Sequence, residues 1–231
     1  MQEVRIAAAS DLQFALEEIV TAFEAGNNAK VLVSFGSSGN FYSQLEQGAP
    51  FDLFLSASAD YTKRLEAKGL TEPNSRKLYA VGRLVIWVHN NLGLKVDTLK
   101  EQTLLGSNVQ HIAIANPDHA PYGQAAVDFL TKAGLYEQIN AKLIYGENIS
   151  QAAQLALSSG NVGIIALSLA LNPAMQEAGD YWLIPLENHL RLEQEMVILK
   201  NQNRPEVQAF YTFMQNDLAR DILEQYGFVL P

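Results

Sequence analysis

The stretch that decides the fold is LYAVGRLVIWVHN, which runs from Leu78 to Asn90. Its apolar and β-branched residues are typical of a strand, but it is longer than the ~10 residues at which most strands end. A second extended run, LRLEQEMVILK, follows between Leu190 and Lys200. One long strand that leaves and one that returns indicate two lobes joined by two crossover strands that act as a hinge. We expect a discontinuous first lobe (residues 1–82 and 194–231), a second lobe (residues 83–193) and a ligand cleft between them.

Elsewhere, short apolar runs alternate with helical patterns, as in an α/β protein with mainly parallel sheets flanked by helices. The apolar residues from Leu12 to Phe23, for example, recur on one face of a helix. The predicted strands are Val4–Ala9, Lys30–Phe35, Asp52–Ser56, Leu78–His89, His111–Asn116, Lys142–Tyr145, Val162–Leu167, Tyr181–Pro185 and Glu195–Lys200. The predicted helices are Leu12–Phe23, Phe41–Glu46, Tyr61–Lys68, Gly123–Ala133, Ile149–Ser159 and Pro205–Tyr226, the last broken near Asn216.

Composition excludes several classes of protein. The chain has 231 residues, of which 48% are hydrophobic and 18% charged, as in a globular protein. It contains no cysteine, which excludes disulfides, thiol catalysis and cysteine-based zinc sites. No apolar run approaches the ~20 residues of a membrane span. A net charge of −9 without a cluster of Lys and Arg argues against nucleic-acid binding.

Four strand-to-helix junctions carry residues suited to binding an anion. They are AAASDL with Ser10 and Asp11, GSSG with Ser37 and Ser38, APYG with Tyr122, and GENIS with Ile149. Helix N-termini present N–H groups without partners, so several of them together can hold an oxyanion without a lysine. Serine and aspartate before a helix are also common N-caps, and we expect Asp11 to be a cap.

At these junctions the chain resembles the periplasmic molybdate-binding proteins of ABC importers, which have the type II periplasmic binding-protein fold. The resemblance covers nearly the full length and is carried by SFGSSGNFYSQLEQGAPFDLFLSA, IAIANPDHAPYGQAA and GENISQAAQLALSSGNVGIIALS. It implies that the oxyanion contacts the hydroxyl and backbone N–H of Ser10 and Ser38, and the backbone N–H of Tyr122 and Ile149. Asp11 is a further expected contact.

The resemblance also implies a function. The chain is expected to be a monomeric receptor, not an enzyme, that binds molybdate or tungstate and delivers it to an ABC permease with its ATPase. No cofactor and no metal beyond the bound molybdate are expected. The location implied is the periplasm, with a signal peptide already removed. One departure concerns Ala166 of GIIAL, where part of the family has a tyrosine that donates its hydroxyl; members with alanine there recruit the residue after the first serine, here Asp11.

Other functions remain open at this point. A sulfate or phosphate receptor would share the fold, and a carboxylate of Asp11 that faced the ligand would favour protonated phosphate over molybdate, which carries no proton. A serine hydrolase using Ser38 is more remote, because Asn40 replaces the last glycine of G-x-S-x-G. A ligand-sensing domain of a transcription regulator is disfavoured because the chain has no DNA-binding segment. The 4 histidines are expected to be surface or loop residues: His89, His111, His119 and His189.

Overall fold

The computed structural model describes residues 2–231, which form two compact units. Unit 1 consists of Met1–Val81 and Glu193–Pro231, and unit 2 of Gly82–Leu192. The long apolar run that begins at Leu78 forms two strands, β4 (Lys77–Gly82) and β5 (Leu84–His89), which belong to different sheets. The expectation that this run exceeds one ordinary strand is confirmed, but the single strand predicted over Leu78–His89 is wrong, because the run breaks at Arg83 and its two parts pair in different sheets.

Unit 1 is built on a five-stranded sheet in the order β2-β1-β3-β10-β4. β1 pairs in parallel with β2 on one side and β3 on the other, whereas β10 runs antiparallel to β3. The elements of this unit, besides β4, are β1 (Gln2–Ala9), the 3₁₀-helix η1 (Ser10–Leu12), α1 (Gln13–Gly26), β2 (Ala29–Gly36), α2 (Ser38–Glu46), β3 (Leu53–Ser56), α3 (Ala59–Ala67), β10 (Leu192–Ile198), α10 (Pro205–Phe213) and α11 (Asp217–Gln225).

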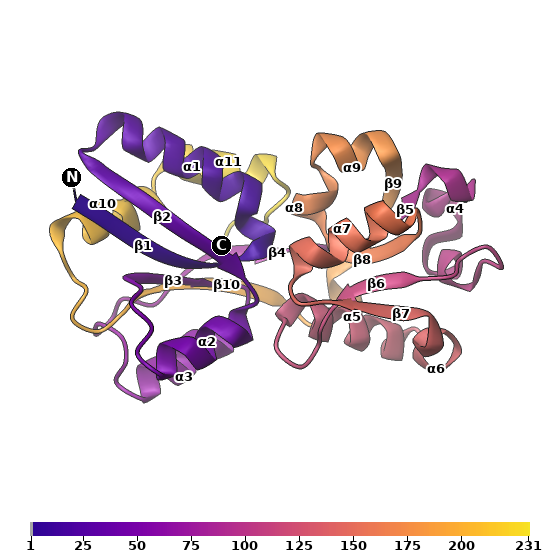
Figure 1. Ribbon diagram of the computed structural model, residues 1–231, viewed down its shortest axis with the longest axis horizontal. Helices are drawn as coiled ribbons and strands as arrows, with labels where there is room; N and C mark the ends of the chain where they lie inside the picture. The colour runs from indigo at the N-terminus through magenta and orange to yellow at the C-terminus, as the bar shows by residue number, and fades with distance from the viewer. Residues whose placement is uncertain (1) are drawn as a thin grey trace. The chain divides into compact units, whose positions relative to one another are not determined.

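Helices cover both faces of this sheet (Figure 1). Alternate residues of each strand face opposite sides, and β1 shows this clearly. Val4, Ile6 and Ala8 pack in one apolar cluster with α1, α10 and α11. Ala7 packs in a second cluster with α2 and α3. The sheet is thus buried between two layers of helices, and its strand ends are the places where the backbone can approach a ligand.

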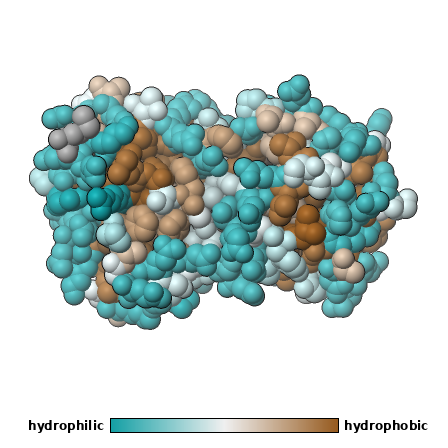
Figure 2. All heavy atoms as spheres, viewed as in Figure 1, coloured by the Kyte–Doolittle hydropathy of each residue, from teal (hydrophilic) through white to brown (hydrophobic). Residues whose placement is uncertain are grey.

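One edge of this sheet is β2. In Figure 2, a brown area of unit 1 lies over this strand, where Leu32 is 43% exposed. Lys30 of the same strand forms an ion pair with Glu24 of α1 at 2.9 Å. A charged side chain on an edge strand limits unwanted pairing with other strands.

Unit 2 repeats this plan with a five-stranded sheet in the order β7-β6-β8-β5-β9. β6 pairs in parallel with β7 and β8, and β5 runs antiparallel to β8 and β9. The elements of unit 2, besides β5, are η2 (Asn90–Leu92), α4 (Val96–Leu99), η3 (Lys100–Leu105), β6 (Ile112–Ala115), α5 (Pro121–Lys132), α6 (Tyr136–Ile139), η4 (Asn140–Lys142), β7 (Leu143–Gly146), α7 (Ile149–Ser159), β8 (Val162–Ala166), α8 (Leu167–Ala170), α9 (Pro173–Ala178), β9 (Gly179–Leu183) and η5 (Leu186–Asn188).

The observed elements confirm the predicted α/β class with mainly parallel sheet cores. The break predicted near Asn216 is present, because Asn216 is the N-cap of α11. The helix predicted from Phe41 begins earlier, at Ser38. Within residues 2–231, no helix combines the length and the apolar character needed to cross a membrane.

Candidate functional site

Three of the predicted site residues lie together at one edge of unit 1. Ser10 and Asp11 directly follow β1, and Ser38 opens α2 after β2. The two strands are parallel, and their last residues, Ala9 and Gly36, are paired. Both junctions therefore lie at the carboxyl edge of the sheet, where open α/β sheets bind ligands.

The hydroxyl of Ser38 is buried and oriented by the backbone. Ser38 is 1% exposed, and its Oγ accepts a hydrogen bond of 2.9 Å from the N–H of Ala57, just beyond β3. A hydroxyl has one hydrogen and two lone pairs, so accepting from Ala57 leaves the hydrogen for a further acceptor. Ser37, one residue earlier, is the N-cap of α2 and accepts from the N–H of Asn40 at 3.4 Å.

Asp11 does not have the role of a cap. Ala9 occupies the N-cap position of η1, and Leu12 that of α1. The prediction that Asp11 caps the helix is therefore wrong. Its Oδ2 instead accepts a hydrogen bond from Nε2 of Gln194, in β10. Since Asp11 is 1% exposed, this is a contact within the protein interior.

The other two predicted site residues lie together in unit 2. Tyr122 is in the first turn of α5, which follows β6 and has a proline near its start. Ile149 opens α7, which follows β7, and Asn148 caps this helix by accepting from the N–H of Gln151 at 3.0 Å. β6 and β7 are parallel and end in register, so both helices begin at the carboxyl edge of the sheet of unit 2.

Glycines allow both helices to approach the strand ends closely. A Cβ placed on Gly123 of α5 would lie 2.1 Å from the carbonyl oxygen of Ala115, the last residue of β6. A Cβ on Gly146, at the end of β7, would lie 2.5 Å from the backbone nitrogen of Ala152 in α7. Since any side chain would clash there, the two glycines fix where the first turns of α5 and α7 lie.

The remaining candidates contribute less. Ala166 is fully buried at the end of β8, and its methyl group cannot donate a hydrogen bond. His189 is a loop residue, as predicted, but it is only 3% exposed, and burial lowers its pKa. Within residues 2–231, no group of three or more His, Asp or Glu is arranged to hold a metal ion.

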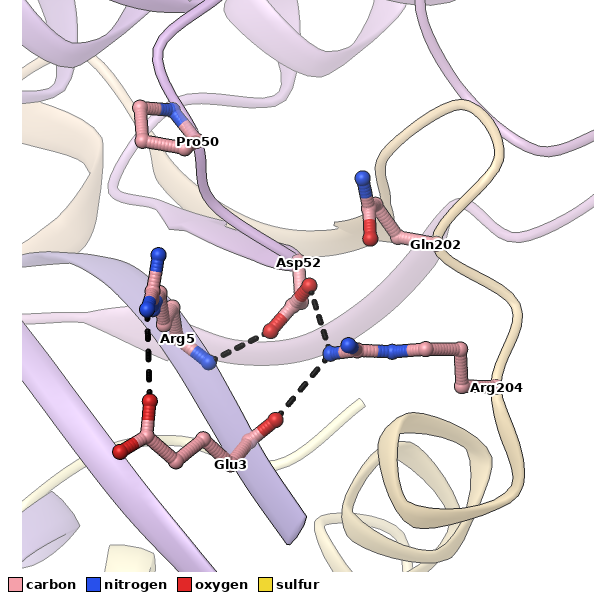
Figure 3. A pocket seen from close by; sticks show the side chains of 6 residues that line it. All are labelled: Glu3, Arg5, Pro50, Asp52, Gln202 and Arg204. Atoms are coloured by element: carbon pink, nitrogen blue, oxygen red, sulfur yellow. Dashed lines mark hydrogen bonds and ion pairs between the residues drawn. The ribbon is translucent and has the colours of Figure 1, made fainter.

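A hollow of about 410 Å³ lies at the amino ends of the parallel strands of unit 1, opposite the carboxyl ends that carry Ser10 and Ser38 (Figure 3). Its lining includes Glu3 and Arg5 from the amino end of β1. Two arginines and two acidic residues balance their charges there, and Arg204 pairs with Asp52 at 2.9 Å. Because these charges are already compensated, the hollow is a poor match for an anion.

Sequence reasoning missed two polar partners of the site, namely the backbone N–H of Ala57 and the side-chain amide of Gln194. For Gln194 a signal was present. Along β10, Leu192, Met196 and Ile198 occupy alternate buried positions, and Gln194 stands in the same series with 0% exposure. A polar residue in such a series needs a buried partner, because an unpaired amide in the interior is unfavourable.

Comparisons with known proteins identify relatives of the chain over nearly its full length. The family model described as "Bacterial extracellular solute-binding protein" matches residues 4–229. The chain is 37% identical to the molybdate-binding protein ModA of Azotobacter vinelandii over 99% of this chain and 90% of that protein. It is 36% identical to the protein of the same name from Rhodobacter capsulatus, over 98% and 88% of the two chains. The solved structure of a periplasmic molybdate-binding protein of A. vinelandii superposes with a TM-score of 0.91 at 30% identity, covering 99% of each chain.

Proposed function

The chain belongs to the bacterial extracellular solute-binding proteins, and on that premise we propose that it is a receptor for molybdate and tungstate. Each unit contributes donors at the carboxyl edge of its sheet. Unit 1 supplies the hydroxyl and N–H groups of Ser10 and Ser38, with Asp11 as a further contact through its backbone. Unit 2 supplies the N–H groups of Tyr122 and Ile149. The similarity to proteins named as molybdate-binding supports this choice of ligand.

Within the molecule, the observation that carries the proposal is the hydrogen bonding of the Ser38 hydroxyl. Its oxygen accepts from the Ala57 N–H, so its hydrogen is available to an anion. The same contact argues against a hydrolase, because an N–H donor cannot take the proton of a nucleophilic serine, and activation requires a base. The role supported for Ser38 is binding.

The chemistry of the donor set supports a fully deprotonated oxyanion. Molybdate and tungstate are tetrahedral dianions that need donors only. Backbone N–H groups at helix N-termini and serine hydroxyls meet this need without a lysine or arginine. The carboxylate of Asp11 binds Gln194 within the interior of unit 1, so we propose that it adds no acceptor to this set of donors.

The proposed partner is the permease of an ABC importer, and the proposed location is the periplasm. The location rests on the family and on a relative named as periplasmic. The partner rests on the resemblance of the sequence to the binding proteins of ABC importers. A carrier role requires neither a catalytic base nor a metal cluster, and residues 2–231 contain no such cluster. We propose no cofactor and no enzymatic step.

Calorimetric titration with molybdate, tungstate, sulfate and phosphate tests the proposal. Molybdate and tungstate are expected to bind with similar affinity. Sulfate is smaller and cannot reach all donors at once, and each unfilled donor costs ~1–3 kcal/mol, so two lost bonds weaken binding about 10²-fold or more. Sulfate or phosphate binding as tightly as molybdate would refute the assignment.

A further inference from the structure

A buried chain of hydrogen bonds connects Asp11 to two residues outside the predicted site. The hydroxyl of Tyr79 donates to Oε1 of Gln194 at 2.9 Å, and Nε2 of Gln194 donates to Oδ2 of Asp11. The exposed fractions are 4% for Tyr79, 0% for Gln194 and 1% for Asp11. Removing one member therefore deprives its neighbour of a buried hydrogen bond, which is unfavourable.

The direction of these hydrogen bonds is fixed by both ends of the chain, a carboxylate that only accepts and a phenol that keeps its proton. Burial, and after it the negative charge of Asp11, raises the pKa of the Tyr79 phenol well above its usual range, so the phenol keeps its proton. A phenol that donates holds the amide oxygen of Gln194, and the amide nitrogen then faces Asp11. The reversed amide would place its oxygen against a carboxylate oxygen, which is repulsive.

The chain of hydrogen bonds lies on one face of the sheet of unit 1. Gln194 alternates along β10 with Met196 and Ile198, which pack in the apolar cluster of α1, and Tyr79 belongs to the same cluster. Ser38 begins α2, whose apolar residues pack in the cluster on the other face. The Asp11 carboxylate is thus held on the α1 face, away from the face to which Ser38 belongs.

The two partners also occupy particular places along the chain. Tyr79 is in β4, the last strand of unit 1 before the chain enters unit 2. Gln194 is in β10, the strand that brings the chain back into unit 1. The turn that carries Ser10 and Asp11 is therefore tied to both crossover strands.

We propose that Gln194 and Tyr79 are positioning residues that hold the Asp11 carboxylate away from the anion and so make the site select fully deprotonated oxyanions. The inference rests on the proposed function and deepens it. Phosphate near neutral pH carries a proton that needs an acceptor, and a carboxylate turned toward the ligand would supply one. The same carboxylate would repel molybdate. Holding the Asp11 carboxylate on the α1 face therefore weakens the binding of phosphate and strengthens the binding of molybdate.

The test is calorimetric titration of wild type, Tyr79→Phe and Gln194→Leu with molybdate and with phosphate. The quantity compared is the ratio of the phosphate Kd to the molybdate Kd. Both variants are expected to lower this ratio at least about tenfold, since one hydrogen bond to a charged group changes affinity by about that factor or more. Gln194→Leu should have the larger effect, because it removes the direct partner of Asp11.

Two controls separate positioning from stability. Thr62→Val removes a hydroxyl that is also 0% exposed and that binds Glu195, the next residue of β10, at 2.5 Å. It is expected to lower Tm and to leave the ratio unchanged. In an Asp11→Ala background no carboxylate remains to be positioned, so adding Tyr79→Phe should no longer change the ratio. A role confined to stability would not produce this dependence on Asp11.

The outcomes are distinguishable. If wild type does not bind molybdate, the proposed function fails, and the inference fails with it. If wild type binds molybdate but the folded Tyr79→Phe protein keeps the wild-type ratio, the inference alone is wrong. It is also wrong if Thr62→Val lowers the ratio equally, or if Tyr79→Phe still acts in the Asp11→Ala background. Tyr79→Phe decides the matter where Gln194→Leu does not fold.

Discussion

Replacing Ser38 with alanine tests the binding site where its geometry is best defined. The change removes the hydroxyl hydrogen proposed to bind the anion. It also removes the oxygen that accepts from the N–H of Ala57 at 2.9 Å. The variant should therefore lose both ligand affinity and stability, and the two losses are measured separately.

The expected magnitudes follow from these two hydrogen bonds. A hydrogen bond to a charged group is worth about 1.5–3 kcal/mol, which corresponds to a molybdate Kd about 10- to 150-fold higher. The buried Ala57 N–H left without an acceptor lowers the free energy of unfolding by about 1–3 kcal/mol. For a chain of this size, that lowers Tm by about 2–12 °C.

Ser37→Ala is the matched control. Ser37 is adjacent and buried, but its hydroxyl accepts from the N–H of Asn40 as the N-cap of α2. Loss of the cap lowers stability by about 0.5–2 kcal/mol, and molybdate affinity should stay within about threefold of wild type. Calorimetric titration gives Kd, and thermal unfolding without ligand gives Tm. A folded Ser38→Ala protein with wild-type affinity, or an equal affinity loss in Ser37→Ala, would refute the reasoning.

Four further predictions concern other features. Asp11→Asn keeps an oxygen that can accept from Gln194 and removes a negative charge, so molybdate affinity should hold or rise; a calorimetric Kd more than about tenfold higher contradicts this. Raising the salt concentration should weaken molybdate binding far less than the ~10³-fold seen when many Lys and Arg contacts are lost, and a steep dependence would indicate a basic site. Gly123→Ala should lower the free energy of unfolding by about 1–3 kcal/mol and weaken molybdate binding, because its Cβ would meet the Ala115 oxygen, whereas Gly26→Ala, with nothing within 4 Å, should do neither. Burial, and to a lesser extent the positive charges of Arg83 and Lys132, lowers the pKa of His189 below 6.5, although the Leu190 carbonyl and Asp128 act in the opposite direction. As pH falls, the unfolded chain therefore takes up this proton before the folded chain does, and the free energy of unfolding should decrease below about pH 6.5. Tm measured against pH should show this decrease in wild type and a smaller one in His189→Gln.

Helices and strands with a clear periodic spacing of apolar residues were predictable from the sequence. α7 begins and ends where the sequence predicts, at Ile149 and Ser159. The apolar run that contains β4 and β5 was recognisable as too long for one ordinary strand, but the break between the two strands at Arg83 was not predicted. The short helices α4, α6, α8 and α9 were not predicted, since 4 to 6 residues do not complete two turns of a repeating apolar pattern.

The direction of side chains at the site was less predictable, because distant residues determine it. The carboxylate of Asp11 turns toward Gln194, which is 183 positions away in the sequence. The hydroxyl of Ser38 is oriented by Ala57, 19 positions away. Local rules about caps apply to each junction alone, and they cannot anticipate a partner that only the assembled sheet brings near.

The position of β10 in the sheet has a consequence for biosynthesis. This strand, Leu192–Ile198, lies between β3 and β4, although it is made long after both. While the ribosome is still producing the middle of the chain, β4 lacks its neighbour, and the strands already made cannot form the complete sheet. Unit 2, in contrast, is one continuous stretch, Gly82–Leu192, so all of its strands are available before β10 emerges. The part of the protein that is made first should therefore finish folding last, and a released chain that ends at Leu192 should already contain a folded unit 2.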